Sequence, residues 1–196
     1  EGDVISAVDG KDITEMDASQ VVEMIKNAQE KEVKLTVHRQ DQEEPLEISV
    51  KVQDVELTSV FGEMLDGKTG YIRISQFTAV APGQYEETFE ELEEQGMERL
   101  VIDLRNNPGG LLTSVCEVLN DILPEGLIVY TEDKYGNRQE EYSEGKTPLE
   151  MPLAVLVNES SASASEIFAG AVKDYGTGTI VGTTTYGKGV VQAVHQ

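Results

Sequence analysis

Cysteine and histidine are nearly absent from this sequence. One cysteine and two histidines stand among 196 residues, and there is no tryptophan. A single thiol excludes a disulfide within the chain and any metal site built from several cysteines. Cys116 lies in a helical pattern of apolar residues, so we expect a buried core residue rather than a reactive thiol. No cluster of ligand residues has metal-binding spacing, so neither a metal nor another cofactor is expected.

Long apolar runs and positive charge are also scarce. No apolar stretch approaches the ~18 residues of a membrane-spanning helix. Lysine and arginine number 15 against 37 aspartate and glutamate residues, which gives a formal net charge of −22. This charge repels phosphate backbones and anionic lipids, so nucleic acid is not expected as a partner. The hydrophobic content of 39% is typical of a globular protein with one sizeable core, or one domain plus a smaller piece.

Residues 1–53 have the pattern of a small α+β unit. A strand runs into an Asp-Gly turn at residues 9–10, and Asp17 is placed to cap a helix through residue 28, with Gln20 as its capping-box partner. Two alternating strands are expected at 32–39 and 45–52. Their inward residues are Val33, Leu35, Val37, Leu46, Ile48, Val50 and Val52, whereas His38 falls on the outward phase.

Residues 54–196 alternate apolar strands with amphipathic helices. The strands are expected at 70–77, 100–105, 127–131, 153–157, 179–182 and 189–194. The helices are expected around 83–96, from 111 to about 123, and from the serine-rich turn to about 174; a polar, hairpin-like loop occupies 132–150. The first helix has an apolar stripe of Tyr85, Phe89 and Leu92, and its glutamates form a solvated face. This alternation predicts an α/β fold, a mainly parallel sheet with crossover helices.

Two strand-to-helix turns carry candidate chemistry. They are DLRNNPGG (103–110) and NESSASASE (158–166), and each follows an expected strand. Both should open toward one crevice, because ligands of open α/β sheets bind beyond the carboxyl ends of the strands. A serine hydroxyl at a helix start lies near free backbone N–H groups, which favour a developing oxyanion. Glycines in the first turn allow its backbone to approach the same point.

A base for such a serine is harder to find. His38 belongs to the first unit and His195 lies next to the chain end, which leaves lysine. Lys188 stands between two glycines in YGKGVVQ, and in an extended segment Gln192 would share its face and orient it. A neutral amine at pH 7 needs a lysine pKa lowered from about 10.4 to about 7, a differential of about 4 kcal/mol. Burial is expected to supply this shift.

Three motifs together resemble those of the C-terminal processing peptidases, or tail-specific proteases. These are DLRNNPGG, VNESSASASEIFAGAVKDYG and TTTYGKGVVQ, in this order along the chain. The resemblance covers essentially the whole chain, because residues 1–53 resemble the later part of the PDZ domain that these proteases carry. It implies that Ser163 is the nucleophile, Lys188 its base and Gln192 the residue that orients the lysine. The implied oxyanion hole consists of Gly109, Gly110 and Ala164.

The resemblance also implies domains, substrates and location. Residues 1–53 would be a partial PDZ-like domain without its carboxylate-binding loop, and residues 54–196 a serine peptidase core cut before its end. The chain, which begins at Glu1, would thus be a fragment. The implied activity is that of a serine endopeptidase acting on polypeptides recognised by their C-terminal tails, in the cell envelope or outside the cell. An exposed strand edge at the cut also allows a homo-oligomer.

Two other features of the sequence suggest different functions. GTTTYGKG (182–189) nearly matches a phosphate-binding loop, but Gly189 replaces the magnesium-binding hydroxyl and a strand pattern follows, so no nucleotide is expected. Ser161 and Ser165 are interpreted as partners of the backbone. Ser160 stands where the family pattern has glycine. The alternative function is a noncatalytic, peptide-binding module of the same fold.

Overall fold

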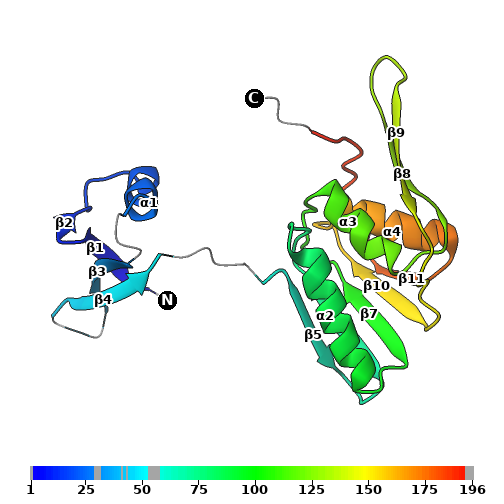
Figure 1. The fold of residues 1–196 in the computed structure, drawn as a ribbon, viewed down its shortest axis with the longest axis horizontal. Coiled ribbons are helices and arrows are strands. Elements are labelled where there is room, and N and C mark those ends of the chain that lie inside the picture. Colours follow the sequence, from blue (N-terminus) through cyan, green and yellow to red (C-terminus); the bar gives the residue numbers. More distant parts are fainter. Residues whose placement is uncertain (1, 29–31, 41, 43, 53–57, 193–196) are drawn as a thin grey trace. The chain divides into compact units, whose positions relative to one another are not determined.

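The chain contains two compact units, residues 1–56 and residues 57–196. The boundary expected from the sequence, after residue 53, lies close to this division. The computed structural model in Figure 1 describes residues 2–28, 32–40, 42, 44–52 and 58–192.

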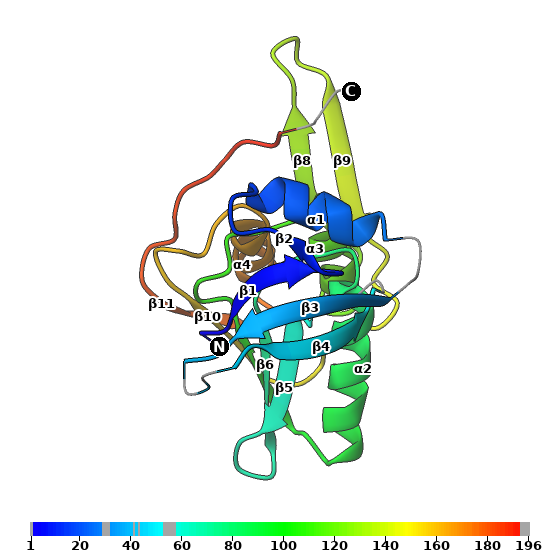
Figure 2. The same cartoon turned by 90° about the vertical axis from the view of Figure 1, so that its left-hand side faces the viewer.

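The first unit is a four-stranded antiparallel sheet with one helix. Its strands are β1 (Val4–Val8), β2 (Lys11–Asp12), β3 (Glu32–His38) and β4 (Leu46–Lys51), in the order β2-β1-β3-β4. Helix α1 (Ala18–Lys26) runs beside the β2–β1 side of the sheet (Figure 2). The buried cluster of this unit consists of Val8, Ile13 and Val33.

The local predictions for the first unit are largely confirmed. Asp17 caps α1 by accepting from Ser19 N at 2.8 Å, and the Gln20 side chain accepts from Asp17 N at 3.2 Å. The helix ends at Lys26 rather than at residue 28. His38 is exposed, as its phase on the strand predicts.

The inward face predicted for β4 is only partly buried. Ile48 and Val50 are 36% and 39% exposed. They pair with Leu35 and Val33 of β3 and share their face, but β4 is the edge strand of the sheet. The buried cluster is centred on β1 and β3, so the apolar face of β4 lies at its margin.

The second unit contains a five-stranded mixed sheet. Its strands are β5 (Val60–Met64), β6 (Thr69–Ile74), β7 (Arg99–Asp103), β10 (Leu153–Val157) and β11 (Thr179–Gly182), in the order β11-β10-β7-β6-β5. Four of these strands are parallel, and β5 pairs antiparallel to β6 at the edge. The predicted α/β architecture with a mainly parallel sheet is therefore confirmed, although strand β5 was not predicted.

Three helices connect the parallel strands and pack side by side. They are α2 (Ala81–Glu94), α3 (Leu112–Asn120) and α4 (Ala164–Tyr175), with α3 in contact with both others. Each crossover steps in the same direction across the sheet, and right-handed crossovers then place their helices on the same face. Tyr85 and Leu92 of α2 are buried, and all seven glutamates between residues 86 and 98 are exposed, as predicted. None of the helices in the described ranges has the length and apolar character needed to cross a bilayer.

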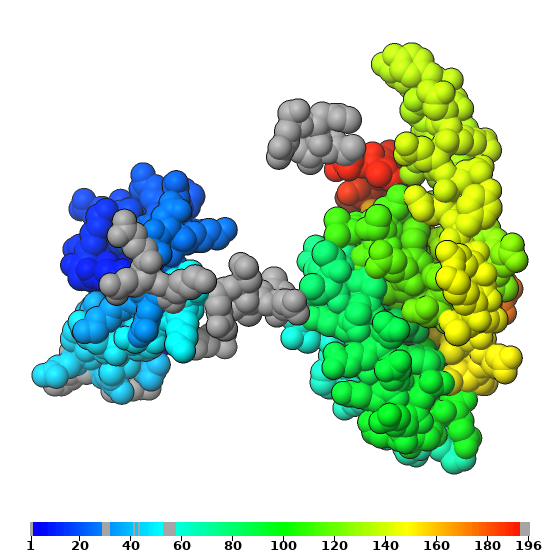
Figure 3. All heavy atoms as spheres, viewed as in Figure 1, coloured from blue at the N-terminus to red at the C-terminus, as the bar shows by residue number. Residues whose placement is uncertain are grey.

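A long hairpin stands out from the second unit (Figures 1 and 3). It consists of β8 (Gly126–Glu132) and β9 (Arg138–Ser143), so the segment expected as a polar loop contains a full strand. The Tyr175 hydroxyl donates to Leu127 O at 2.9 Å and attaches the base of the hairpin to α4. Cys116 of α3 is half-buried against the core, in partial agreement with its expected burial.

Candidate active site

The two strand-to-helix turns meet at the carboxyl ends of β7 and β10. These strands are parallel neighbours, so the turns that follow them lie at the same edge of the sheet. Asn107, which is fully buried, connects them: its carbonyl oxygen accepts from Ala162 N at 3.0 Å, and its side-chain amide donates to Ile74 O at 2.9 Å. Sequence reasoning assigned no role to Asn107.

Two serines of the second turn hold it in place. Ser161 and Ser165 are fully buried. The Ser161 hydroxyl donates to Leu104 O at 2.7 Å, and the Ser165 hydroxyl donates to Asn107 O at 3.0 Å. Both serines therefore bond to the backbone, as interpreted from the sequence, and their acceptors lie in the neighbouring turn.

Ser163 differs from its neighbours in backbone and surroundings. It is the N-cap residue of α4, with φ 56° and ψ −113°, a conformation that a residue with a side chain adopts only under strain. Its side chain is half-buried and lines a cleft. The turn thus presents this serine at the positive end of α4, where negative charge is favoured.

Glycine is required where the first turn approaches Ser163. Gly109 has φ +105°, and a Cβ there would lie 2.7 Å from Ala162 O and 2.8 Å from Ser163 Cβ. Its N–H donates to the Asn107 side chain at 2.8 Å, so this N–H is already engaged. Gly109 therefore allows the close approach of the two turns.

Two other backbone N–H groups remain for a developing oxyanion. Within the described residues, neither Gly110 N nor Ala164 N donates a hydrogen bond. Gly110 lies against Phe77, to which it is joined by an isolated bridge of parallel type, and Ala164 is the first residue of α4. Of the three residues expected in an oxyanion hole, two thus have an available donor.

The cleft beside Ser163 has a volume of about 960 Å³. Ser163 and Ile167 come from α4, and Lys188 to Val191 come from the segment after β11. The hairpin forms the opposite wall, with Val129, Tyr130, Thr131, Glu132, Asp133, Asn137 and Gln139. Figure 3 shows the segment after β11, in red, beside the base of the hairpin. The structure therefore brings Ser163 and Lys188 to one cleft, with a wall that the sequence did not predict.

The surroundings expected for Lys188 are not found. Residues 183–192 form no strand, and Lys188 and Gln192 are exposed. Between described residues, no hydrogen bond joins Ser163 Oγ to Lys188 Nζ, or Lys188 to the Gln192 side chain. The chain leaves the sheet at Gly182, the end of the edge strand β11, and the described residues provide no further strand to extend it. Residues 193–194 of the expected strand lie outside the described residues.

Glu166 connects the serine turn to the lysine segment. Its carboxylate accepts from Ser163 N at 2.8 Å, Gly187 N at 2.6 Å and Lys188 N at 2.8 Å, and from the Thr185 hydroxyl at 2.8 Å. Burial acts to raise the pKa of Glu166, but these hydrogen bonds outweigh it and lower the pKa, so the group is ionised at neutral pH. Sequence reasoning missed this residue, although its position three residues after the cap is that of a capping box.

The Asp103–Arg105 charge pair of the DLR motif contacts the sheet and not the cleft. Asp103, at the end of β7, is 3% exposed. Arg105 Nη2 donates to its carboxylate at 2.7 Å, and the Tyr71 hydroxyl does so at 2.7 Å. Burial acts to raise the pKa of Asp103, but the bonds from Arg105 and Tyr71 keep it below its usual value. The pair fastens the start of the glycine-bearing turn to the sheet.

Among the described residues, no three His, Cys, Asp or Glu side chains are grouped to hold a metal ion. The chemistry available at the cleft is that of a hydroxyl at a helix N-terminus, two free backbone N–H groups and a nearby amine.

The chain is similar to known peptidases over its whole length. The profile of peptidase family S41 matches residues 68–196, and that of the PDZ domain matches residues 1–38. A carboxyl-terminal-processing protease of Synechocystis sp. is 36% identical over 99% of this chain and 46% of the relative. A CtpA-like serine protease of Staphylococcus aureus is 35% identical over 99% of this chain and 39% of the relative. The solved structure of a photosystem II D1 C-terminal processing protease has 30% identity and a TM-score of 0.64, and covers 98% of this chain and 54% of that chain.

These matches and the α/β fold define a serine peptidase fold with a PDZ-type segment before it. The chain belongs to peptidase family S41. The resemblance to C-terminal processing peptidases found in the motifs is confirmed. The chain spans about half the length of the curated relatives it matches.

Proposed function

We propose that this chain carries the catalytic core of a serine endopeptidase in which Ser163 is the nucleophile and Lys188 the general base. One observation supports Ser163, rather than Ser161 or Ser165, as the nucleophile. Ser161 and Ser165 are buried and bonded to the backbone, whereas Ser163 lines the cleft that Lys188 also lines.

The proposed reaction begins with attack of Ser163 Oγ on the scissile carbonyl carbon. As the O–C bond forms, the hydroxyl proton passes to Lys188 Nζ. When the tetrahedral intermediate collapses, the C–N bond breaks and the Lys188 ammonium returns this proton to the leaving amine. Water then attacks the ester carbonyl carbon and loses a proton to Lys188 Nζ. When this second intermediate collapses, the bond from carbon to Ser163 Oγ breaks, and the Lys188 ammonium returns the proton to Ser163 Oγ as the acid leaves.

The negative charge of the intermediate would lie on the former carbonyl oxygen. The N–H groups of Gly110 and Ala164 are the proposed donors, because both are free within the described residues. Ala164 follows Ser163 in the chain, and Gly110 follows Gly109, whose backbone approaches Ser163. Gly109 supports the hole by letting the turns approach. Loss of one such donor in other enzymes reduces turnover by about a hundredfold or more.

Lys188 must approach Ser163 and lose its proton for this reaction. The bonds from Glu166 to Gly187 N and Lys188 N hold the backbone of this segment beside the serine turn, and they support the proposed pairing. Gln192 is proposed to orient the amine once Lys188 is turned toward Ser163.

The proposed substrates are polypeptides recognised through their C-terminal tails. Two observations support this: the PDZ-type match at residues 1–38, and the relatives named as carboxyl-terminal-processing proteases. PDZ domains bind tails by adding them as a strand to a sheet edge. The proposed location is the cell envelope or the exterior of the cell. We also propose that the chain can form a homo-oligomer through an exposed strand edge.

A noncatalytic peptide-binding module is the second candidate. The exposure of Lys188 and the absence of a bond to Ser163 Oγ among the described residues favour it. A fluorophosphonate distinguishes the two functions, because it forms a covalent adduct only with an activated serine.

The test is labelling of this chain across pH, with the adduct located by peptide mass spectrometry. We expect an adduct on Ser163, lost in Ser163→Ala and strongly reduced in Lys188→Ala. Ser160→Ala is the matched control, because Ser160 is exposed in the same turn and should leave labelling unchanged. A folded protein with no adduct at any pH would support the noncatalytic module, and full labelling of Lys188→Ala would remove Lys188 from the mechanism.

A further inference from the structure

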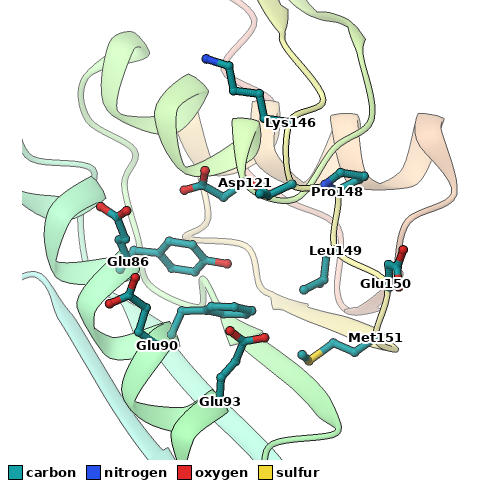
Figure 4. A pocket seen from close by; sticks show the side chains of 12 residues that line it. Glu86, Glu90, Glu93, Asp121, Lys146, Pro148, Leu149, Glu150 and Met151 are labelled. Carbon is teal, nitrogen blue, oxygen red and sulfur yellow. The ribbon is translucent and has the colours of Figure 1, made fainter.

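A second groove lies on the helical side of this unit, away from the catalytic cleft. It has a volume of about 760 Å³, within the range of ligand pockets, and shares no lining residue with the cleft at Ser163. Its walls are α2, the end of α3 at Asp121, and the loop 146–151 (Figure 4). Leu149 N donates to Ile122 O at 3.1 Å and holds this loop against the end of α3.

The floor of the groove is apolar and aromatic. Tyr85 and Phe89 of α2 form a tilted ring pair with centroids 5.9 Å apart. Leu149 and Met151 face them from the loop (Figure 4). Such a surface suits an aliphatic side chain, and the faces of aromatic rings attract cations.

The rim is strongly acidic. Five carboxylates line it: Glu86, Glu90, Glu93, Asp121 and Glu150. Lys146 is the one cation among the lining residues, and its amine already pairs with Glu144. Burial and the nearby Glu86 raise the pKa of Asp121, so negative charge is crowded at the groove without a matching cation. The rim is therefore complementary to a positively charged group.

The Tyr85 hydroxyl at the floor has no hydrogen-bond partner among the described residues and is open to the groove. Tyr85 as a whole residue is 2% exposed, but among the described residues the one fully buried side-chain polar atom without a partner is Ser114 Oγ, not the Tyr85 hydroxyl. Burial, with Asp121 and Glu93 nearby, raises the pKa of Tyr85, so the phenol keeps its proton and can donate. An acceptor that a ligand brings into the groove can therefore take this hydrogen bond in place of water. A backbone carbonyl of a bound peptide is such an acceptor.

From this combination of rim, floor and hydroxyl we infer that the groove binds a short segment of a protein partner in which arginine or lysine alternates with apolar residues. The cations pair with Glu90 and Glu93, an apolar side chain packs on Phe89 and Met151, and a backbone carbonyl accepts from Tyr85. A second copy of this chain is a poor occupant, because its net charge of −22 repels an acidic groove.

The test uses a fluorescent peptide with the sequence Gly-Leu-Arg-Leu-Arg-Gly, blocked by acetyl and amide groups, and its citrulline analogue. The amide end prevents recognition of a terminal carboxylate. Binding to this chain is measured by fluorescence anisotropy at low and high salt. Glu90→Gln with Glu93→Gln removes two rim charges, and Glu87→Gln with Glu94→Gln is the matched control, since these exposed residues of α2 lie outside the groove.

We expect the arginine peptide to bind more tightly than the citrulline peptide, and less tightly at high salt. The rim variant should weaken binding about tenfold and the control by less than about twofold. Tyr85→Phe should weaken binding about threefold or more, because the donor is lost while the ring remains. Equal weakening by the rim variant and its control would show attraction to the overall charge and overturn the proposal. Absence of binding, or equal binding of the citrulline peptide, would also overturn it.

Discussion

Replacing Glu166 by glutamine should detach the lysine segment from the serine turn without unfolding the protein. The carboxylate accepts four hydrogen bonds, from the N–H groups of Ser163, Gly187 and Lys188 and from the Thr185 hydroxyl. A glutamine side chain is of the same size but has only one acceptor oxygen. Its NH2 group would replace the second oxygen and would face backbone N–H groups, which cannot accept a hydrogen bond from it.

The expected magnitude follows from the bonds lost. Hydrogen bonds to charged groups contribute about 1.5–3 kcal/mol each, so loss of two costs about 3 kcal/mol or more. The segment keeps the bond from Tyr186 N to Ser161 O at 3.0 Å. A change of about 3 kcal/mol lowers the docked population relative to the detached one by about a hundredfold.

Amide hydrogen exchange measures this change residue by residue. The N–H groups of Gly187 and Lys188 should exchange about a hundredfold faster in Glu166→Gln. Glu159→Gln is the matched control, because Glu159 accepts from the Thr183 hydroxyl at the other end of the same segment, at 3.3 Å and in an exposed position. Labelling of Ser163 by a fluorophosphonate should fall in parallel with docking if the proposed dyad is correct.

The pH dependence provides a second measurement on the native protein. The folded pKa of Glu166 is lowered, so its stabilisation is fully present above the unfolded value of about 4.3 and is lost as pH falls through the folded pKa. The protection of the Gly187 N–H, measured as its exchange rate relative to the intrinsic rate at the same pH, should therefore fall only at acidic pH. Unchanged exchange at Gly187 and Lys188 in a folded Glu166→Gln protein would refute this reasoning.

Three further predictions concern the backbone and the thiol. Ser163→Gly should unfold at a higher urea concentration than Ser163→Ala, by about 1 kcal/mol of stability, because glycine relieves the strain at φ 56°; equal stabilities would argue against strain. Gly110→Ala should destabilise by about 3 kcal/mol or more, because a Cβ would overlap the Phe77 carbonyl oxygen, whereas Gly170→Ala in the open middle of α4 should stabilise by about 0.5–1 kcal/mol. Burial and nearby glutamates raise the pKa of Cys116 to about 11, so iodoacetamide should alkylate it at pH 8 about a hundredfold more slowly than a free cysteine; a normal rate would contradict that environment.

Features that depend on neighbouring residues were read correctly from the sequence. The cap at Asp17, the apolar stripe of α2 and the alternation of parallel strands with helices all depend on local spacing. The three motifs placed the serine and glycine turns at the ends of adjacent strands, which the sheet order confirms. Chain periodicity and capping chemistry act over a few residues, so the sequence displays them directly.

Features that depend on distant residues were decided by the tertiary structure. Strands β5 and β9 went unpredicted, because their stability comes from pairing with β6 and β8 rather than from their own composition. Lys188 is exposed because the described segment after the edge strand β11 adds no strand to the sheet, which the alternating sequence pattern did not reveal. The four bonds to Glu166 join residues up to 22 positions apart. Such contacts form only when folding brings separate segments together, so local sequence patterns point to a candidate serine and its turn but not to what surrounds them.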